Sequence, residues 1–225
     1  MIKFDFIDIG CGTGGSIGWA NGNFGGPDSK YLGIDNREHE VSIARKAGLN
    51  VILQDVTEES YELPKCKFIT MLHVLEHLKS EQDVENVIKK SIDAASDFIF
   101  MIVPSFDSKE YLKELGFKLT WTDWIGHSTA VTSDMFRRIA HKLGVEAIIK
   151  QSMPVHNTIS EEIIPFDAPV DSIEYSKNMG KKEYAEFKNV YRETWCIINL
   201  NCPNWNDIKD KINLMQKNNK SCAKK

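Results

Sequence analysis

A short apolar run that ends in closely spaced glycines constrains the fold of this chain most strongly. The run is Phe4–Ile9, and it is rich in the aromatic and β-branched residues that favour strands. Gly10, Gly12, Gly14 and Gly15 follow it directly. Glycine admits positive φ and lets a ligand touch bare backbone. We therefore predict a buried strand that runs into a tight, ligand-binding glycine loop.

The glycine loop fits two known patterns. Gly10, Gly12 and Gly15 match the dinucleotide pattern G-x-G-x-x-G, which is a weak signal when it occurs alone. Asp8 and Gly14 extend the match to D-x-G-x-G-x-G. A purely structural glycine turn is the alternative to both patterns.

Two further predicted strands end in acidic residues. Tyr31–Asp35 and Val51–Asp55 have the length and composition of short strands. Asp35 lies about 20 residues beyond the glycine loop, where an α/β nucleotide site places the carboxylate that binds a ribose diol. Ligands of open α/β sheets bind at the carboxyl ends of the strands, so Asp8, Asp35 and Asp55 should converge. The alternative for Asp35 is an exposed residue at a strand end.

The rest of the chain alternates predicted strands and helices, as in an α/β protein. Ser80 should cap one helix with Asp83, and Thr132 or Ser133 should cap another that stops at Gly144. Further strands are expected at residues 68–72, 98–103, 145–150 and 194–200, and helices at residues 16–20, 38–47, 80–95, 109–115, 132–143 and 206–216.

From Phe4 to Gly144, the order of these motifs resembles the class I S-adenosylmethionine-dependent methyltransferases. The resemblance implies an α/β, Rossmann-like, seven-stranded and mostly parallel sheet, with helices on both faces and the antiparallel seventh strand between the fifth and sixth. It implies S-adenosylmethionine as cofactor and S-adenosylhomocysteine as product. The implied cofactor-binding residues are Asp8, Gly10, Cys11, Gly12, Gly14, Asp35, Asn36, Asp55, Val56, Leu72 and His73.

The resemblance also implies a role for several of these positions. The glycine backbone packs on the methionine end of the cofactor, and the acid at Asp8 helps to hold its amino group. Asp35 binds the ribose, Asp55 accepts a hydrogen bond from the adenine amino group, and the Val56 N–H reaches the ring. His73 opens the segment after the fourth strand and would lie near the transferred methyl group.

Two histidines are predicted to be catalytic. A hydroxyl acceptor must lose a proton, and histidine suits that task because its pKa lies near neutrality. His73 lies at the end of the fourth strand, and His127 lies in an aromatic loop after Trp121 and Trp124. The alternative for each is a structural or substrate-orienting histidine. Phe106, Trp121, Trp124 and Tyr175 are expected either to wall the pocket or to lie in the core.

A metal-assisted mechanism is an alternative that the sequence does not favour. His73, Glu76, His77 and His127 resemble the metal set of small-RNA 3′-end methyltransferases and quinone-pathway O-methyltransferases. The chain departs from that set by having His73 where glutamate is usual. Three imidazoles and a carboxylate would suit zinc, iron or manganese. Metal-free relatives also carry the Leu-Glu-His run, so our prediction assigns no metal ligand.

The long connection at residues 151–193 is predicted to be a substrate lid within one domain of residues 1–225. Unstructured loops of that length are uncommon and usually functional. A helix is expected inside it at about Lys181–Val190. A C-terminal helix and tail follow at residues 204–225, and the apolar face of that helix docks on the domain or forms a dimer contact.

Composition limits the partners and the setting. The net charge is −4, so no global basic field would attract nucleic acid, and no apolar run is long enough to span a membrane. Five scattered cysteines without C-x-x-C pairs indicate reduced thiols in a cytoplasm. We expect a monomer or homodimer. The usage of Lys, Asn and Ile suggests a bacterial source, and from that a sugar or surface-polysaccharide precursor as acceptor.

The predicted function is methyl transfer from S-adenosylmethionine to a small-molecule acceptor, at oxygen rather than nitrogen. Two alternatives stay open. One is an NAD(P)-dependent oxidoreductase, which the three strand-end acids disfavour. The other is a non-catalytic subunit that binds S-adenosylmethionine.

Overall fold

The computed structural model describes residues 2–171 and 183–222. The strands are β1 (Phe4–Ile9), β2 (Tyr31–Asp35), β3 (Val51–Leu53), β4 (Cys66–Leu72), β5 (Ala95–Pro104), β6 (Phe117–Leu119), β7 (Ala147–Pro154), β8 (Ile163–Pro165) and β9 (Tyr191–Asn199). The helices are α1 (Gly15–Asn23), α2 (Glu38–Lys46), α3 (Glu81–Ala94), α4 (Lys109–Glu114), α5 (Ser133–Leu143) and α7 (Trp205–Cys222), with a 3-10 turn, η1, at Leu75–His77.

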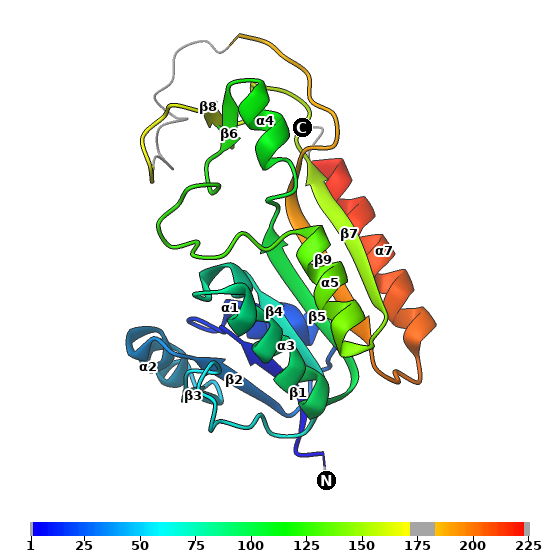
Figure 1. Ribbon diagram of the computed structural model, residues 1–225. Helices are drawn as coiled ribbons and strands as arrows, with labels where there is room; N and C mark the ends of the chain where they lie inside the picture. Colours follow the sequence, from blue (N-terminus) through cyan, green and yellow to red (C-terminus); the bar gives the residue numbers. More distant parts are fainter. Residues whose placement is uncertain (1, 172–182, 223–225) are drawn as a thin grey trace.

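Seven strands form one central sheet in the order β3-β2-β1-β4-β5-β9-β7 (Figure 1). The first five strands of this order pair in parallel. β9 is antiparallel to both neighbours, so that Cys196 lies opposite Met101 of β5 and Ile149 of β7. The predicted seven-stranded, mostly parallel sheet with its antiparallel last strand inside the edge is confirmed.

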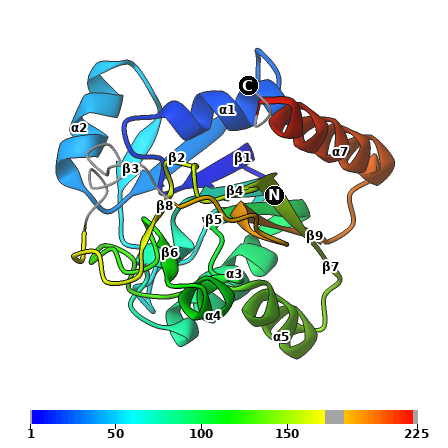
Figure 2. The same ribbon diagram turned by 90° about the horizontal axis from the view of Figure 1, so that it is seen from above.

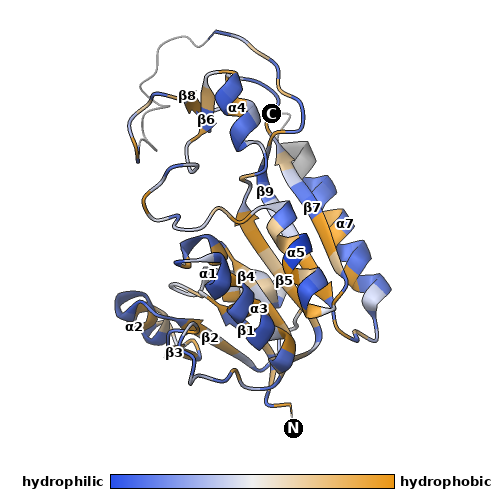
Figure 3. Ribbon diagram, in the orientation of Figure 1, coloured by the Kyte–Doolittle hydropathy of each residue, from blue (hydrophilic) through white to orange (hydrophobic). Residues whose placement is uncertain are grey.

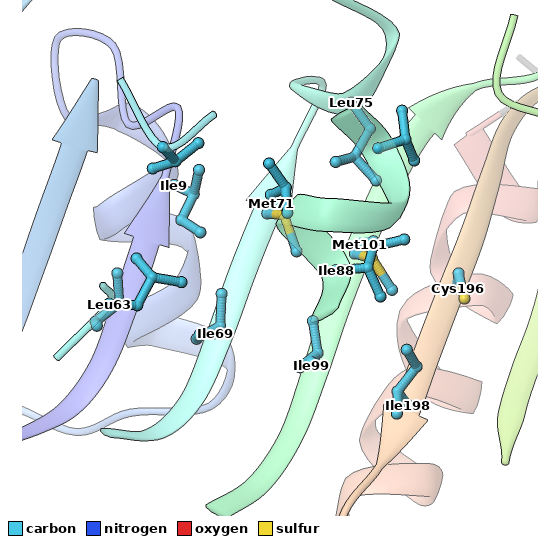
Figure 4. Close-up of a cluster of buried hydrophobic side chains, with 14 of the residues drawn as sticks. Ile9, Leu63, Ile69, Met71, Leu75, Ile88, Ile99, Met101, Cys196 and Ile198 are labelled. Atoms are coloured by element: carbon cyan, nitrogen blue, oxygen red, sulfur yellow. The ribbon is translucent and has the colours of Figure 1, made fainter. Parts of the chain in front are cut away.

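Helices cover both faces of the sheet, as predicted (Figure 2). On one face α1, α2 and α7 enclose a core that includes Phe6, Phe100 and Trp195. On the other face α3 and α5 cover a second core, in which Met71, Leu75, Ile88 and Met101 are drawn together in Figure 4. The strands are largely hydrophobic and the outer sides of the helices hydrophilic (Figure 3), as a sheet buried on both faces requires.

The predicted helix caps are present. The Ser80 side chain accepts a hydrogen bond from the Asp83 N–H (3.2 Å) at the start of α3, and Thr132 accepts one from the Met135 N–H (3.1 Å) at the start of α5. α5 ends at Gly144 with φ 67°, a left-handed conformation that glycine adopts at little cost. The Thr132 cap fixes where α5 begins, and therefore where the preceding loop ends.

Several element boundaries differ from prediction. α1 continues to Asn23, beyond the helix predicted at residues 16–20. β7 and β9 are longer than expected, because they pair with each other as far as Pro154 and Tyr191. The predicted lid at residues 151–193 therefore contributes its two ends to the central sheet.

The middle of that connection packs on α4 and β6. β8 pairs antiparallel with β6, with Lys118 opposite Ile164, and neither strand was predicted. We call α4, β6, residues 155–171 and residues 183–190 the cap; it lies above one end of the central sheet in Figure 1. The cap has a small core of its own, made of Leu112, Leu119, Val155, Ile163, Phe187 and Val190.

The predicted helix at about Lys181–Val190 is wrong for residues 183–190. This segment runs back along residues 155–158, since the Phe187 N–H donates to the His156 carbonyl (2.8 Å) and the Thr158 N–H to the Ala185 carbonyl (3.0 Å). Residues 181 and 182 lie outside the described residues. Pairing between distant segments has overridden local helix propensity here.

The C-terminal helix α7 docks on its own domain. Ile208 and Ile212 are buried against the sheet, in the same core as Trp195. The apolar face for which a dimer contact was the alternative is therefore covered within the chain. Across residues 2–171 and 183–222, every helix is too short or too polar to cross a bilayer.

Candidate functional site

A cavity of about 290 Å³ opens at the carboxyl ends of β1, β2 and β4. Of the predicted cofactor residues, Gly10, Asp35, Asn36, Asp55, Val56 and His73 line it. The rest of its lining, which the sequence did not single out for the cofactor, is Ile9, Ile34, Arg37, Gln54, Val74, His77 and Leu78. The predicted residues Asp8, Cys11, Gly12, Gly14 and Leu72 lie outside this lining.

Asp35 is the most constrained carboxylate in the cavity. Its side chain is 3% exposed, and it closes the glycine loop by accepting a hydrogen bond from the Gly12 N–H at Oδ2 (2.8 Å). The Arg37 N–H and Nε donate to Oδ1 (2.9 and 3.3 Å). Asp35 therefore ties the end of β2 to the glycine loop and still faces the cavity.

The glycine loop has the backbone conformation that its sequence predicts. Gly10 and Gly14 have φ values of 71° and 104°, and a Cβ at either would collide with Val74 or Leu49 respectively. A Cβ at Gly12 would meet only the Arg37 side chain, at 3.5 Å. Gly10 and Gly14 are thus needed for packing, whereas Gly12 leaves open backbone.

Asp8 lies beneath the loop and not in the cavity. It is fully buried, and its carboxylate accepts hydrogen bonds from the Ser16 hydroxyl (2.5 Å) and the Thr70 hydroxyl (2.6 Å). Burial raises the pKa of Asp8 to about 6, against the lowering effect of these two hydroxyls. In this arrangement Asp8 braces β1 against α1 and β4, and both oxygens are engaged within the chain.

Asp55 lines the cavity as a charged acceptor. Burial alone would raise its pKa, but hydrogen bonds from Thr57 and Asn36 hold the pKa below its usual value. Thr57 donates through both its N–H (2.9 Å) and its hydroxyl (2.7 Å) to Oδ1. The neighbouring Val56 is buried, and both residues line the cavity as predicted.

His73 is held between two glutamates. Its Nδ1 lies 3.5 Å from Glu76 Oε1, and its Nε2 lies 3.5 Å from Glu193 Oε1. Burial would lower the pKa of His73, but the carboxylates of Glu193 and Glu76 outweigh that effect and raise the pKa to about 9. His73 also has a φ of 56°, which is strained for a non-glycine residue. A histidine protonated at neutral pH does not suit the predicted role of base.

His127 has the opposite environment. Burial lowers its pKa, and its Nδ1 lies 3.0 Å from the Trp121 carbonyl. A carbonyl can only accept, so Nδ1 carries the proton and Nε2 keeps its lone pair. The Trp124 ring packs edge-on against the imidazole, with 4.6 Å between centroids, and Phe106 contacts it less closely. Tyr175, the fourth predicted pocket aromatic, lies outside the described residues.

Glu76, His77 and His127 form a cluster around a buried carboxylate. One ligand atom from each lies within 4.8 Å of the other two. Glu76 is fully buried, and neither of its carboxylate oxygens has a hydrogen-bond partner among the described residues. The Nδ1 of His77 lies 2.7 Å from the Gly126 carbonyl, which leaves its Nε2 free, as in His127. His73 is not part of this three-residue cluster.

The sequence of this chain matches a known protein family. A family model described as a methyltransferase domain matches residues 5–149, which is more than half of the chain. The chain belongs to the methyltransferase-domain family. The predicted membership of the class I S-adenosylmethionine-dependent methyltransferases is confirmed. A search of curated proteins found no sequence that matches this chain.

Solved structures share the fold of the methyltransferase at low sequence identity. Magnesium protoporphyrin IX methyltransferase (ChlM) from Synechocystis PCC 6803, with bound SAM, is 13% identical, with a TM-score of 0.51 over 88% of this chain and 71% of that chain. A SAM-dependent methyltransferase from Archaeoglobus fulgidus is 17% identical, with a TM-score of 0.52 over 86% and 85%. The plantazolicin methyltransferase BamL, in complex with a triazolic desmethylPZN analog and SAH, is 17% identical, with a TM-score of 0.53 over 88% and 77%.

Proposed function

We propose that this methyltransferase transfers a methyl group from S-adenosylmethionine to an oxygen of a small-molecule acceptor. The family and the fold support methyl transfer, and two of the similar structures are described with bound SAM or SAH. The observation that carries the choice of oxygen is the neutral His127. An oxygen acceptor has a proton to lose, and His127 Nε2 is free to take it.

The cavity residues offer hydrogen-bonding groups that this cofactor needs. Asp35 can accept hydrogen bonds from a ribose diol, and Asp55 with the Val56 N–H can meet the two hydrogen-bonding sides of an adenine edge. Asp35 already accepts three hydrogen bonds, so the Arg37 Nε must give way for a diol to bind through both hydroxyls. That exchange costs little, because the Arg37 side chain is 62% exposed and exposed ion pairs are weak.

The protein then has a limited chemical task. S-adenosylmethionine supplies a methyl group on a positively charged sulfur, so the chain must orient the acceptor and exclude water. His127 Nε2 accepts the acceptor hydroxyl proton as the oxygen takes the methyl group. The Trp121 carbonyl steadies the imidazolium by holding Nδ1–H. The cap covers this end of the sheet, and we propose that it acts as the lid of a single domain.

A sugar-like acceptor, such as a precursor of a surface polysaccharide, is the class that we propose. Trp121 and Trp124 are half-buried beside His127, and rings in that position can stack on a sugar. The carboxylate of Glu193 is 19% exposed near His73 and can accept hydrogen bonds from hydroxyl groups. We also propose a cytoplasmic, bacterial enzyme that binds neither nucleic acid nor membranes, as a monomer or homodimer.

The base assignment is tested with His127→Gln, once an acceptor is found by following S-adenosylhomocysteine release across a panel of hydroxylated compounds. Loss of a general base should lower kcat by roughly 10²- to 10⁴-fold and leave the KM for S-adenosylmethionine unchanged. His39→Gln, on the exposed side of α2, is the matched control. A kcat for His127→Gln equal to that of His39→Gln would refute the base assignment.

A metal-assisted form of the same reaction is the second candidate. The observation that favours it is the buried Glu76 carboxylate, whose oxygens lack hydrogen-bond partners within the described residues. A ring nitrogen of His77 and one of His127 lie within 4.8 Å of it, and His73 Nδ1 lies 3.5 Å from its Oε1. Backbone carbonyls that hold the outer N–H of both histidines are typical of metal-ligating imidazoles. In that case Glu76, His77 and His127 would hold the ion, and the acceptor oxygen would lose its proton because the ion stabilises its anion.

Metal binding can be measured without turnover. Calorimetric titration of chelator-treated protein with zinc or manganese should give one site per chain if the second candidate holds, and Glu76→Gln should lose it. S-adenosylhomocysteine binding by Glu76→Gln serves as the control for folding. An absence of heat with both metals, together with full activity after chelation, would leave the base mechanism alone.

A further inference from the structure

A buried lysine joins the cap to the loop that carries His127. We call residues 120–131 the histidine loop. Lys118, on β6, is 5% exposed, and its Nζ donates to Asp123 Oδ2 (2.5 Å) in the histidine loop and to the Ala168 carbonyl (2.5 Å) in the cap. One ammonium group therefore fixes the two segments relative to each other.

A second contact links the same two segments. The Ile125 N–H, in the histidine loop, donates to Asp171 Oδ1 (2.7 Å), three residues beyond Ala168. At the first residue of the histidine loop, the β6–β8 pairing continues as the Thr120 N–H donates to the Glu162 carbonyl (2.9 Å). The histidine loop is thus attached to the cap at its start and near its middle.

The far side of the histidine loop is attached to the turn after β4. The Gly126 carbonyl lies 2.7 Å from His77 Nδ1, and the Thr129 N–H donates to the Glu76 carbonyl (3.1 Å). The Thr129 hydroxyl donates to the Leu78 carbonyl (2.6 Å). His127 lies between Gly126 and Thr129, which contact the turn, and two residues beyond Ile125, which contacts the cap, so its position depends on both sides.

The charge on Lys118 decides whether this arrangement can persist. Asp123 Oδ1 is buried and has no hydrogen-bond partner among the described residues, so Lys118 is the group that compensates the carboxylate. The Asp123 side chain as a whole is 33% exposed, but leaving its buried Oδ1 without a nearby positive charge is costly. If the ammonium is removed, Asp123 must turn toward water, and the histidine loop must move with it.

We propose that Lys118 is a positioning residue that couples the cap to His127. It does not line the cofactor cavity, so its effect on the reaction passes through Asp123 and the histidine loop. The importance of His127 rests on the proposed function, whereas the coupling between cap and loop does not. As a consequence, the cap and the histidine loop should be ordered together.

Hydrogen exchange of residues 121–129 tests the coupling without an acceptor. Lys118→Met should speed exchange of the Ile125 and Thr129 amides by about tenfold or more, because local opening becomes easier. Lys113→Met, on the exposed side of α4, is the matched control and should exchange as wild type. Adding Asp123→Asn to Lys118→Met should restore protection, since no uncompensated carboxylate remains.

Asp171→Ala is a second variant that leaves Lys118 in place. Asp171 is exposed, so this change should keep the fold and speed exchange at Ile125. Unchanged exchange in both Lys118→Met and Asp171→Ala would overturn the coupling, as would a double variant that exchanges as fast as Lys118→Met. S-adenosylhomocysteine binding is measured in parallel: its absence from the wild type would refute the proposed function and leave the exchange result to judge the coupling.

Discussion

His73 and His127 both lie near Glu76, yet their pKa values move in opposite directions. Two carboxylates raise the pKa of His73 to about 9, whereas burial lowers the pKa of His127. Neither direction could be predicted from the sequence, because Glu193 is far along the chain from His73 and meets it only through the β5–β9 pairing. Both residues were candidate bases because they are histidines. Their surroundings in the fold give them different roles.

Asp8 shows the same limit. The family resemblance implied that Asp8 helps to hold the cofactor, and the structure buries its carboxylate between Ser16 and Thr70. Burial raises the pKa of Asp8 in the folded protein to about 6 from its usual 3.8. Between pH 3.8 and pH 6, the folded protein therefore binds a proton at Asp8 that the unfolded protein has lost. Stability from Asp8 is therefore greatest below pH 3.8 and is lost as the pH rises through 6.

We predict that Asp8→Asn removes this pH dependence. Between pH 4.5 and 7.5, the free energy of unfolding of the wild type should fall relative to Asp8→Asn by about 2 kcal/mol. Urea unfolding of both proteins without cofactor measures the difference at each pH. A difference that does not vary with pH would show that Asp8 has an ordinary pKa in the folded protein.

Within the cap, α4 was predicted, but local sequence patterns could not predict the strand pair β6–β8. Its two strands lie more than forty residues apart, at residues 117–119 and 163–165, and each is three residues long. Strands this short leave too few residues for a two-residue period to appear. By contrast, the N-terminal capping residues of helices α3 and α5 could be predicted. Ser80 and Thr132 each accept a hydrogen bond from a backbone N–H only three residues away.

We predict that the cap core can be weakened without loss of cofactor binding. Ile163 is fully buried in the cap, so Ile163→Ala should destabilise the cap by about 2–5 kcal/mol. Hydrogen exchange in residues 155–171 should increase, while the affinity for S-adenosylhomocysteine stays within about twofold. Ile159→Ala, 65% exposed in the same segment, is the control. Loss of cofactor binding only in Ile163→Ala would show that the cap is needed to form the cavity.

The central sheet of the whole molecule could be predicted because each strand is marked by a short apolar run in the sequence, and these runs follow one another in the order typical of the family. Apolar runs ending at Gly10, Asp35 and Asp55 mark strands that bring their carboxyl ends to one edge, and the cavity lies there. Which of these acids faces the cavity could not be predicted, since it depends on partners such as Gly12, Thr57 and Thr70 that fold around each carboxylate.

The central claim is that this cavity binds S-adenosylmethionine through Asp35, and calorimetry with S-adenosylhomocysteine and, separately, NAD tests it most directly. We predict micromolar binding of S-adenosylhomocysteine and none of NAD. Asp35→Ala should weaken the affinity by ~10-fold or more, about 1.4 kcal/mol, whereas the exposed Asp28→Ala should not change it. Binding of NAD alone, or equal affinity in Asp35→Ala and the wild type, would contradict this assignment.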